Sequence, residues 1–241
     1  TALLPITPAD TVTEYQISAT LSDATEVDFP INLADPWYQL YQGEVTELFC
    51  TGFEGEDSTK DWTATGGWEH GAPMGQAGDP AAAYAGSDIF GINLAGTYKP
   101  KSSSTLTSPL IPVGDFKKVR LQYRRWLGVE DGIFDQASIV ANGQTVWQNA
   151  FGDGGSSLNH RDSEWRFHDV DLSPYVKDGA VQVKFEIASD PGLELGGWTL
   201  DDVSIVAWDA PACGDGQLDD KEACDEGAAN SDTAADACRT S

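Results

Sequence analysis

The chain has 241 residues, of which 39 are acidic and 14 are basic, so its formal net charge at pH 7 is −25. This charge repels nucleic acid phosphates and anionic lipid, and no apolar run approaches the ~18 residues needed to span a bilayer. Apolar residues make up 40% of the chain, enough for a sizeable core, which excludes global disorder. The acidic excess suits hard cations, above all Ca²⁺, although it also serves solubility alone.

The first predicted element is a β-hairpin within residues 12–33. Two runs alternate between apolar and polar positions on either side of a turn at Ser22–Thr25. The apolar positions are Tyr15, Ile17, Ala19 and Leu21 in the first run, and Val27, Phe29, Ile31 and Leu33 in the second. Two strands alone are marginal in water. Residues 1–46 are therefore predicted to be the C-terminal part of an Ig-like β domain and a linker, with packing on the following unit as the alternative.

Residues 47–209 contain short β-type runs that are separated by Gly, Asp, Asn and Pro. Apolar and polar side chains alternate along the clearest runs, at intervals typical of an antiparallel sandwich. The predicted strands are Leu106–Ile111, Lys117–Trp126, Gln136–Ala141, Gln144–Gln148, Trp165–Leu172, Ala180–Ala188 and Trp198–Ala207. Asn142-Gly143 predicts a tight turn between two of these strands. The predicted fold class is therefore all-β, with an antiparallel sandwich as its main unit.

Residues 210–241 form a short acidic segment after the sandwich, with almost no large apolar side chains. Three of the four cysteines of the chain lie here, at Cys213, Cys224 and Cys238. A segment that cannot build a core is usually held by disulfides or ions, which predicts an oxidising, extracellular compartment. Four cysteines allow three pairings, and the sequence does not choose among them.

Seven stretches between Phe49 and Ala207 resemble, in the same order, the jelly-roll modules of secreted bacterial peptidases and myxobacterial surface proteins. These modules are MAM-like and carbohydrate-binding-like sandwiches. The stretches are FCTGFEG (49–55), GAPMGQAGDPAAAYAG (71–86), FGINLAGTYKP (90–100), LTSPLI (106–111), VRLQYRRWLGVEDGIFDQASIVANGQTVW (119–147), EWRFHDVDLSPY (164–175) and GGWTLDDVSIV (196–206). The resemblance implies a jelly-roll topology, a secreted or cell-surface location and an accessory role.

The cysteines add a second resemblance and one departure. Residues 213–241 resemble the cysteine-rich repeat of myxobacterial surface proteins, which normally continues into a further cysteine, so we expect a truncated repeat here. MAM domains carry several internal cysteines, whereas this module has only Cys50. Some bacterial relatives place a cysteine where Ser204 stands, so a disulfide between first and last strands is not expected. Cys50 is predicted to be free or paired with the tail.

Three acidic clusters are candidate calcium sites, because Ca²⁺ takes about 6–8 oxygen ligands. The resemblance implies that the first and last strands of the sandwich lie side by side, which would bring the carboxylates of the first cluster together. The alternatives are solvated edge residues and turns rich in Asp and Gly. The clusters are Glu54, Glu56, Asp201 and Asp202 at the strand junction; Glu130, Asp131 and Asp135 in a loop; and Asp215, Asp219, Glu222 and Asp225 in the tail.

The sequence does not favour an enzyme. His160, Glu164 and His168 have a helical spacing, but they fall on a loop and a strand, where that spacing is not expected to converge. No zinc-protease or nucleophile-elbow motif is present. Aromatic side chains could instead stack on a glycan. The candidates for stacking are Trp62, Trp68, Trp147 and Trp165, whereas Trp126 and Trp198 are predicted to fill the core.

The leading functional hypothesis is a calcium-stabilised, non-catalytic accessory module of a secreted or cell-surface protein, which acts in adhesion, substrate positioning or spacing. A carbohydrate-binding module and a structural subunit of an extracellular assembly are the alternatives. Because the chain opens on Thr1 without a signal-peptide pattern, we expect a mature or excised fragment.

Overall fold

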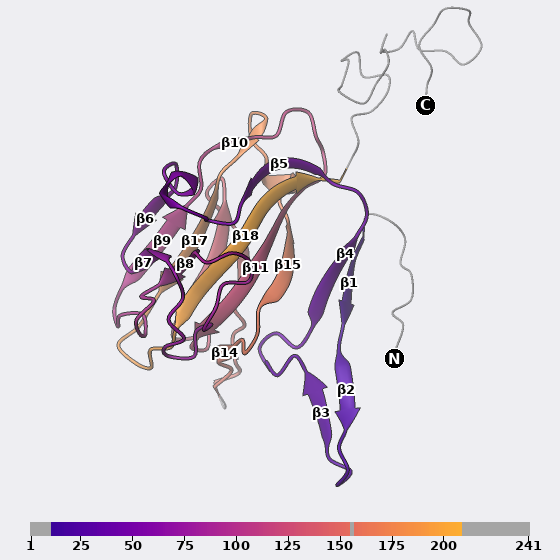
Figure 1. The fold of residues 1–241 in the computed structure, drawn as a ribbon, viewed down its shortest axis with the longest axis vertical. Helices are drawn as coiled ribbons and strands as arrows, with labels where there is room; N and C mark the ends of the chain where they lie inside the picture. The colour runs from indigo at the N-terminus through magenta and orange to yellow at the C-terminus, as the bar shows by residue number, and fades with distance from the viewer. Residues whose placement is uncertain (1–10, 155–156, 209–241) are drawn as a thin grey trace, which may run out of the picture.

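The computed structural model describes residues 11–154 and 157–208, and within these ranges the chain is built from antiparallel strands (Figure 1). The strands are β1 (Thr11–Tyr15), β2 (Ile17–Thr20), β3 (Glu26–Phe29), β4 (Tyr38–Gln42), β5 (Thr46–Thr51), β6 (Thr63–Thr65), β7 (Trp68–Gly71), β8 (Ile89–Ile92), β9 (Ser103–Thr107), β10 (Ile111–Pro112), β11 (Val119–Val129), β12 (Gln136–Ala141), β13 (Gln144–Gln148), β14 (His160–Arg161), β15 (Arg166–Asp171), β16 (Ala180–Val181), β17 (Val183–Ala188) and β18 (Gly197–Ala207). Two 3₁₀ turns, η1 (Glu56–Ser58) and η2 (Ser173–Tyr175), complete the elements of these ranges. The all-β prediction is confirmed.

Two sheets face each other and form the predicted sandwich. The larger sheet has the order β14-β11-β18-β8-β7, with β15 also paired to β11 and β5 paired to β18. The smaller sheet has the order β13-β12-β17-β9-β6. Because β5 and β18 are neighbours, the first and last strands of the sandwich lie side by side, as the jelly-roll resemblance implied.

Alternation along the long strands places the core between the sheets. In β11 every second residue, from Val119 to Val129, is buried, and the residues between them are half-buried. The fully buried Trp198 occupies the centre, with its ring centroid 5.6 Å from that of Phe185 and 6.4 Å from that of Tyr123. Offset and edge-on ring contacts of this kind stabilise a core beyond the area that they bury.

The predicted strands correspond closely to those of the structure in the second half of the sandwich. Residues 136–141 and 144–148 form β12 and β13, and their turn residues Asn142 and Gly143 have φ angles of 46° and 84°. The predicted strand 180–188 is interrupted at Gln182, whose backbone N–H donates to the Asn142 side chain. The four strands within residues 46–71 and 89–92 were not predicted one by one, because each is short and rich in polar or glycine residues.

Only part of the predicted hairpin forms, and it docks on the sandwich. Strands β2 and β3 pair as predicted, but residues 30–33 lie outside any strand and β1 pairs with β4 instead. Two ladders, β1 with β4 and β2 with β3, make a long ribbon beside β15 (Figure 1). The connecting residues 30–37 and the start of β4 provide the contacts, and Asn32 donates to Asp162 over 2.8 Å. The ribbon therefore packs on the following unit, which was the alternative in the sequence prediction. The Ig-like origin of residues 1–46 stays a prediction.

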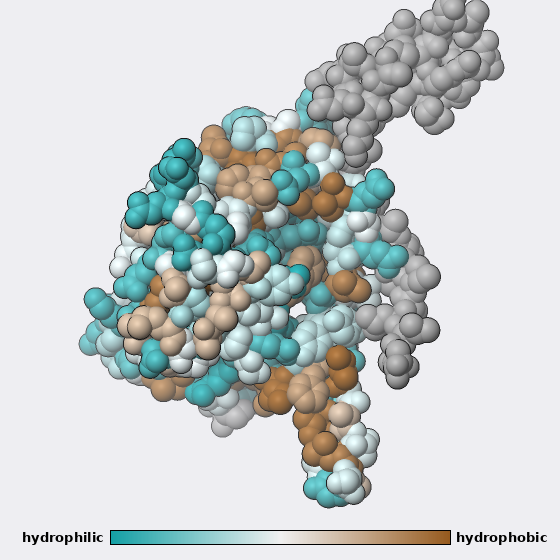
Figure 2. Space-filling model, in the orientation of Figure 1, coloured by the Kyte–Doolittle hydropathy of each residue, from teal (hydrophilic) through white to brown (hydrophobic). Residues whose placement is uncertain are grey.

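The part of the ribbon formed by β2, β3 and the connector carries apolar side chains on its surface, and Figure 2 shows brown atoms there above a hydrophilic tip. The exposed apolar residues of this part are Ile17, Leu21, Ile31 and Leu33. Leu33 is 88% exposed. This part of the ribbon therefore has an apolar surface.

Cys50 lies on β5, where it is exposed and forms no disulfide with any described residue. Its partner in the ladder with β18 is Ser204, so no cysteine stands opposite it. Cys213, Cys224 and Cys238 lie outside the described residues, and their disulfides stay a prediction.

Replacing Asp35 with alanine is expected to lower the free energy of unfolding by about 2–4 kcal/mol, because the buried Arg125 guanidinium loses a partner 2.6 Å away. Asp28→Ala, at an exposed position of β3 in the same ribbon, is the matched control and should cost less than ~1 kcal/mol. Urea unfolding followed by tryptophan fluorescence measures both variants. Equal losses would show that this ion pair does not hold the ribbon in place.

Candidate ligand-binding pocket and acidic clusters

A buried charge network lies where the ribbon meets the edge of the larger sheet. Arg125, whose side chain is 0% exposed, places Nε 2.8 Å from Asp162 Oδ2 and Nη2 2.6 Å from Asp35 Oδ2. Arg166 lies 3.3 Å from an oxygen of each of the same two carboxylates. Burial alone would raise the pKa of Asp162, but the neighbouring Arg125 holds that pKa well below its usual range. Two guanidinium groups are thus balanced by two carboxylates, which we call the arginine network.

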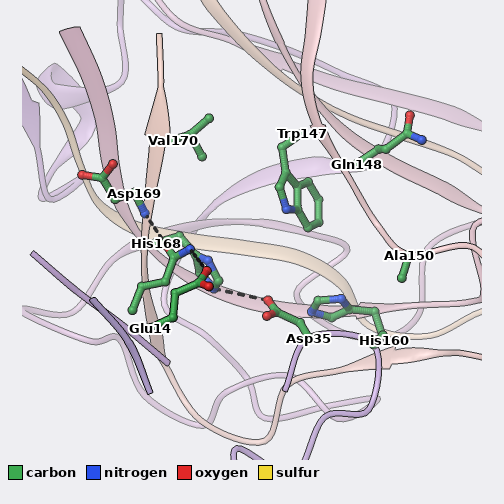
Figure 3. Close-up of a pocket in the computed structure, with 11 residues that line it drawn as sticks. Glu14, Asp35, Trp147, Gln148, Ala150, His160, His168, Asp169 and Val170 are labelled. Carbon is green, nitrogen blue, oxygen red and sulfur yellow. Dashed lines mark hydrogen bonds and ion pairs between the residues drawn. The ribbon is translucent and has the colours of Figure 1, made fainter. Parts of the chain in front are cut away.

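A pocket of about 330 Å³ adjoins the arginine network, between the ribbon and the edge of the sandwich (Figure 3). Its walls come from β1, the connector and β4 on one side, and from β13, β14 and β15 on the other. The lining residues are Glu14, Ala34, Asp35, Gln39, Trp147, Gln148, Ala150, His160, His168, Asp169 and Val170. This size lies at the lower end of the range for small-ligand sites.

Two buried histidines line this pocket. Strands β14 and β15 both pair with β11 and so carry His160 and His168 to the same edge of the larger sheet. Glu164 instead accepts a hydrogen bond from Tyr38, and among the described residues it forms no three-ligand group with the two histidines. Neither ring nitrogen of His160 has a hydrogen-bond partner, and Nε2 of His168 has none. Nε2 of His160 lies 3.3 Å from Asp162 Oδ1, but outside hydrogen-bond geometry.

Burial and the charge of Arg125 keep both histidines neutral. Burial is the larger cause, and together with the guanidinium it lowers the pKa of His160 and holds that of His168 well below its usual value. A neutral imidazole has one N–H donor and one acceptor nitrogen. The pocket therefore contains hydrogen-bonding groups that the protein itself does not use.

The tryptophan predictions are corrected in part. Trp62 and Trp68 are 8% and 6% exposed and belong to the core, so their rings are not available to a glycan. Trp198 fills the core as predicted, but Trp126 lies half-buried on the outer face of the larger sheet and packs edge-on against Trp165. Only Trp147, among the four candidates for glycan stacking, lines the pocket.

The carboxylates predicted at the strand junction hold a loop. Glu54 accepts hydrogen bonds from the backbone N–H groups of Ser87 and Asp88, and Asp201 accepts them from Tyr84 and Ala85. These donors lower the pKa of Glu54, whereas burial outweighs them and raises that of Asp201. Among the described residues, neither carboxylate belongs to a group of three ligands within 4.8 Å of one another.

The remaining two members of the junction cluster lie apart from these anchoring contacts. Glu56 is exposed in η1, and Asp202 is half-buried on β18 with a φ angle of 45°. Asp215, Asp219, Glu222 and Asp225, the predicted tail site, lie outside the described residues.

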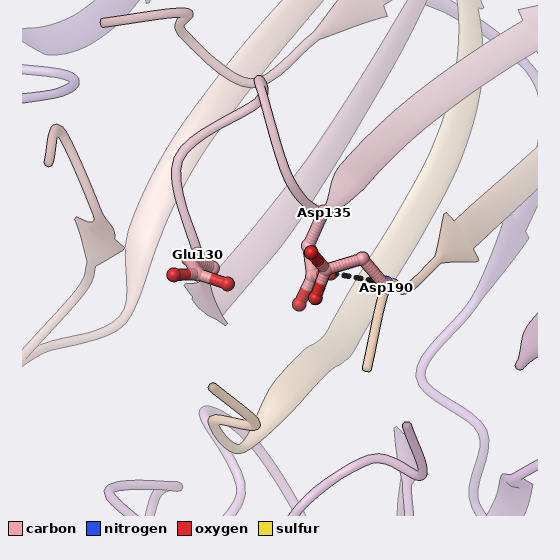
Figure 4. Close-up of side chains that lie close together, drawn as sticks. All are labelled: Glu130, Asp135 and Asp190. Atoms are coloured by element: carbon pink, nitrogen blue, oxygen red, sulfur yellow. Dashed lines mark hydrogen bonds between the residues drawn. The ribbon is translucent and has the colours of Figure 1, made fainter. Parts of the chain in front are cut away.

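The loop cluster contains a residue that the sequence did not identify. Glu130, Asp135 and Asp190 each place a carboxylate oxygen within 4.8 Å of the others (Figure 4). Asp131 turns away and accepts backbone hydrogen bonds from Ile133, Gly152 and Leu158. Asp190 lies 55 residues after Asp135, and no local pattern links the two.

Electrostatic repulsion characterises this three-carboxylate cluster. Burial first, and then the charges of Asp135 and Asp190, raise the pKa of Glu130. Asp135 is nearly buried, and its oxygens accept hydrogen bonds from the Tyr98 hydroxyl at 2.5 Å and from the Asp190 backbone at 2.7 Å. A cation would relieve the remaining repulsion between Glu130 and Asp190.

Comparison with known sequences links part of the chain to a peptidase. No family model matches the chain. Bacillopeptidase F of Bacillus subtilis (strain 168) is 30% identical over 154 residues, which are 62% of this chain and 10% of that protein. The chain thus spans about a tenth of the length of the curated relative that it matches.

Comparison with solved structures finds adhesin and carbohydrate-binding domains. The K1 cleaved adhesin domain of Lys-gingipain from Porphyromonas gingivalis W83 is 16% identical, with 68% of this chain and 99% of that chain covered and a TM-score of 0.44. CBM35 from Paenibacillus barcinonensis is 16% identical, with the same coverage of 68% and 99% and a TM-score of 0.37. The described part of this chain has no helix with the length and apolar character to span a membrane.

The neutral state of His168 predicts a pH dependence of stability. Its pKa is lower in the folded than in the unfolded protein, where it is about 6.5, so its contribution is complete above pH 6.5 and is lost as the pH falls below that value. Between pH 7 and pH 5, the wild type should therefore lose about 2 kcal/mol more stability than His168→Asn. Urea unfolding at several pH values measures this difference, and parallel curves would contradict it.

Asp79 is a control for which the stability should change with pH in the opposite direction. Burial raises its pKa to about 7, and neither carboxylate oxygen has a hydrogen-bond partner. The contribution of Asp79 to the free energy of unfolding is fully present below the unfolded-state pKa of about 3.8. It is lost as the pH rises through about 7. Relative to Asp79→Asn, the wild type should thus gain stability as the pH falls from 7 to 5, the reverse of the His168 result.

Proposed function

We propose that this chain is a non-catalytic accessory module of a larger extracellular protein, and that it binds a ligand for adhesion or for positioning a substrate. The observation that carries the proposal is the 154-residue similarity to Bacillopeptidase F, which covers most of this chain but only 10% of the peptidase. A segment that occupies a tenth of a larger protein is best explained as a module of it. The resemblance of residues 47–209 to jelly-roll modules of secreted proteins supports the extracellular location.

The pocket supports binding rather than catalysis. Among the described residues no Ser, Thr, Cys, Lys or Tyr lines the pocket, and of the three carboxylates that could act as nucleophiles, Asp169 is paired with Arg120 and Glu14 accepts a hydrogen bond from Gln39. Asp35 is engaged by Arg125 and Arg166, and the two histidines are buried and neutral. Walls of mixed polar and aromatic character are typical of a site that binds a small molecule.

Calcium stabilisation is the second part of the proposal, and it rests on the cluster Glu130, Asp135 and Asp190. Their oxygens approach within 4.8 Å of one another, so one hard cation could contact all three. Burial first, and then the charges of Asp135 and Asp190, raise the pKa of Glu130, and a cation would remove the repulsion between these charges. The residues present therefore fit a calcium ion in their chemistry.

A structural role in an extracellular assembly is the second candidate function. One observation favours it: Ile17 on β2 and Ile31 and Leu33 in the connector are exposed apolar side chains of the ribbon. An exposed apolar surface of this kind is typical of a contact with another domain or subunit.

Calcium is expected to raise the melting temperature of the chain by about 5 °C at saturating concentration, because it binds the folded state alone. Asp190→Asn should remove most of this increase, since it deletes one of the three charges. Differential scanning calorimetry with EDTA and with millimolar Ca²⁺ measures the effect. Glu56→Gln is the control at the other predicted site, and loss of the increase in that variant alone would place calcium at the strand junction instead.

The accessory role predicts retention on a surface without turnover. The chain should be depleted from solution by at least one material among insoluble cellulose, chitin, peptidoglycan and gelatin-coated beads, and it should leave labelled casein intact. Sedimentation and gel electrophoresis measure both properties. Hydrolysis of casein, or retention on none of these materials, would contradict the proposal.

A further inference from the structure

Two imidazoles beside the arginine network lack hydrogen bonds of good geometry, although Nε2 of His160 faces Asp162 at 3.3 Å and Nε2 of His168 faces Asp35 at 3.9 Å. His160 is 1% exposed and His168 is 5% exposed, and three ring nitrogens between them have no hydrogen-bond partner. Buried polar groups without partners cost about 1–3 kcal/mol each, so a water molecule or a bound ligand that pairs with them is favoured. The imidazoles need a ligand that can both donate and accept.

No cationic side chain of the described residues lines the pocket to bind an anion. Three lining residues are carboxylates, Glu14, Asp35 and Asp169, and no Lys or Arg lines the pocket. Bringing an anion next to these oxygens would be unfavourable.

The same surroundings disfavour a cation. Asp35 is paired with Arg125 and Arg166, and Asp169 is paired with Arg120 at 2.5 Å. The guanidinium groups that keep His168 unprotonated would also repel a cationic ligand next to it. Glu14 accepts a hydrogen bond from Gln39 and is exposed, and a single exposed charge contributes little. A neutral molecule is therefore the kind of ligand that fits the charges of this pocket best.

The walls add an apolar surface to these polar groups. Trp147 is half-buried, and Val170, Ala34 and Ala150 line the pocket with it. In Figure 3 the Trp147 indole and His160 border the same space. A ligand that matches these walls has a C–H face for the indole and hydroxyl groups that donate to and accept from imidazole and carboxylate. A sugar ring has both features.

We infer that this pocket binds the end of a neutral glycan, with Trp147 as the apolar platform and His160, His168 and Glu14 as hydrogen-bonding groups. The inference rests on the proposed function and names the ligand class. A volume of about 330 Å³ restricts the bound part to one or two sugar units. Because the ribbon supplies Glu14, Asp35 and Gln39, the ligand would contact ribbon and sandwich together.

A printed glycan array tests the inference. The array carries neutral oligosaccharides of glucose, galactose, mannose and N-acetylglucosamine, together with sialylated, uronate and glucosamine counterparts. The full chain is expected to bind at least one neutral glycan and none that carries charge at the recognised end. Titration calorimetry then gives a Kd for the neutral oligosaccharide with the highest signal.

Two pairs of variants locate the binding site. Trp147→Leu should raise that Kd tenfold or more, whereas Trp165→Ala, on the outer face, should leave it unchanged. Because Trp147 also contacts Trp198 in the core, a second pair avoids loss of folding as an explanation. Glu14→Ala should raise the Kd about threefold to tenfold, and Glu26→Ala, exposed on β3 of the same ribbon, should not.

Three results would overturn the inference. They are binding of no neutral glycan, binding of charged glycans alone, and neutral binding that survives both pocket variants but is lost in Trp165→Ala. Retention on gelatin with a silent array would overturn the glycan inference and leave the accessory role standing. Casein hydrolysis would overturn the accessory role itself.

Discussion

Two guanidinium groups are buried at the edge of the sandwich, and the arrangement of ribbon, pocket and histidines depends on how they are neutralised. Arg125 is 0% exposed, so without carboxylate partners its desolvation would cost several kcal/mol. Asp162 on the sheet side supplies one negative charge, and Asp35 supplies the second from the connector of the ribbon. Because the second charge comes from another segment, the charge balance of the sandwich edge is complete only when the ribbon is docked.

The sequence predicted what depends on local alternation and missed what depends on long-range charge. Strands β12 and β13 agree with the prediction because their alternation and their Asn142-Gly143 turn are local signals. Arg125 falls on the same face of β11 as the buried Tyr123 and Leu121. Because Arg124 precedes it, the two arginines read in the sequence as part of an exposed basic surface. Nothing near Asp35 indicates that a guanidinium 90 residues away will select it.

The sequence could predict the acidic sites only as segments rich in Asp and Glu, without saying which side chains meet. The Glu54 and Asp201 carboxylates are accounted for by backbone N–H groups of residues 84–88, and hydrogen bonds from a loop leave no trace in residue type. The cluster around Asp135 needed Asp190, which approaches only because the loops after β11 and β17 meet at one end of the sandwich. A pattern of acids therefore indicates a candidate cation site, but the topology decides which acids meet.

The arginine network also determines how the pocket and the ribbon influence each other. Burial, and after it the charge of Arg125, keeps His160 and His168 neutral near physiological pH. The ribbon carries part of the pocket wall, so any ligand that touches both sides binds the docked state alone and stabilises docking by mass action. By the same linkage, a change that weakens the pair of Asp35 with Arg125 lowers ligand affinity by the fraction of molecules in which the ribbon is undocked. Ligand affinity and ribbon docking therefore both depend on the ion pairs of the arginine network.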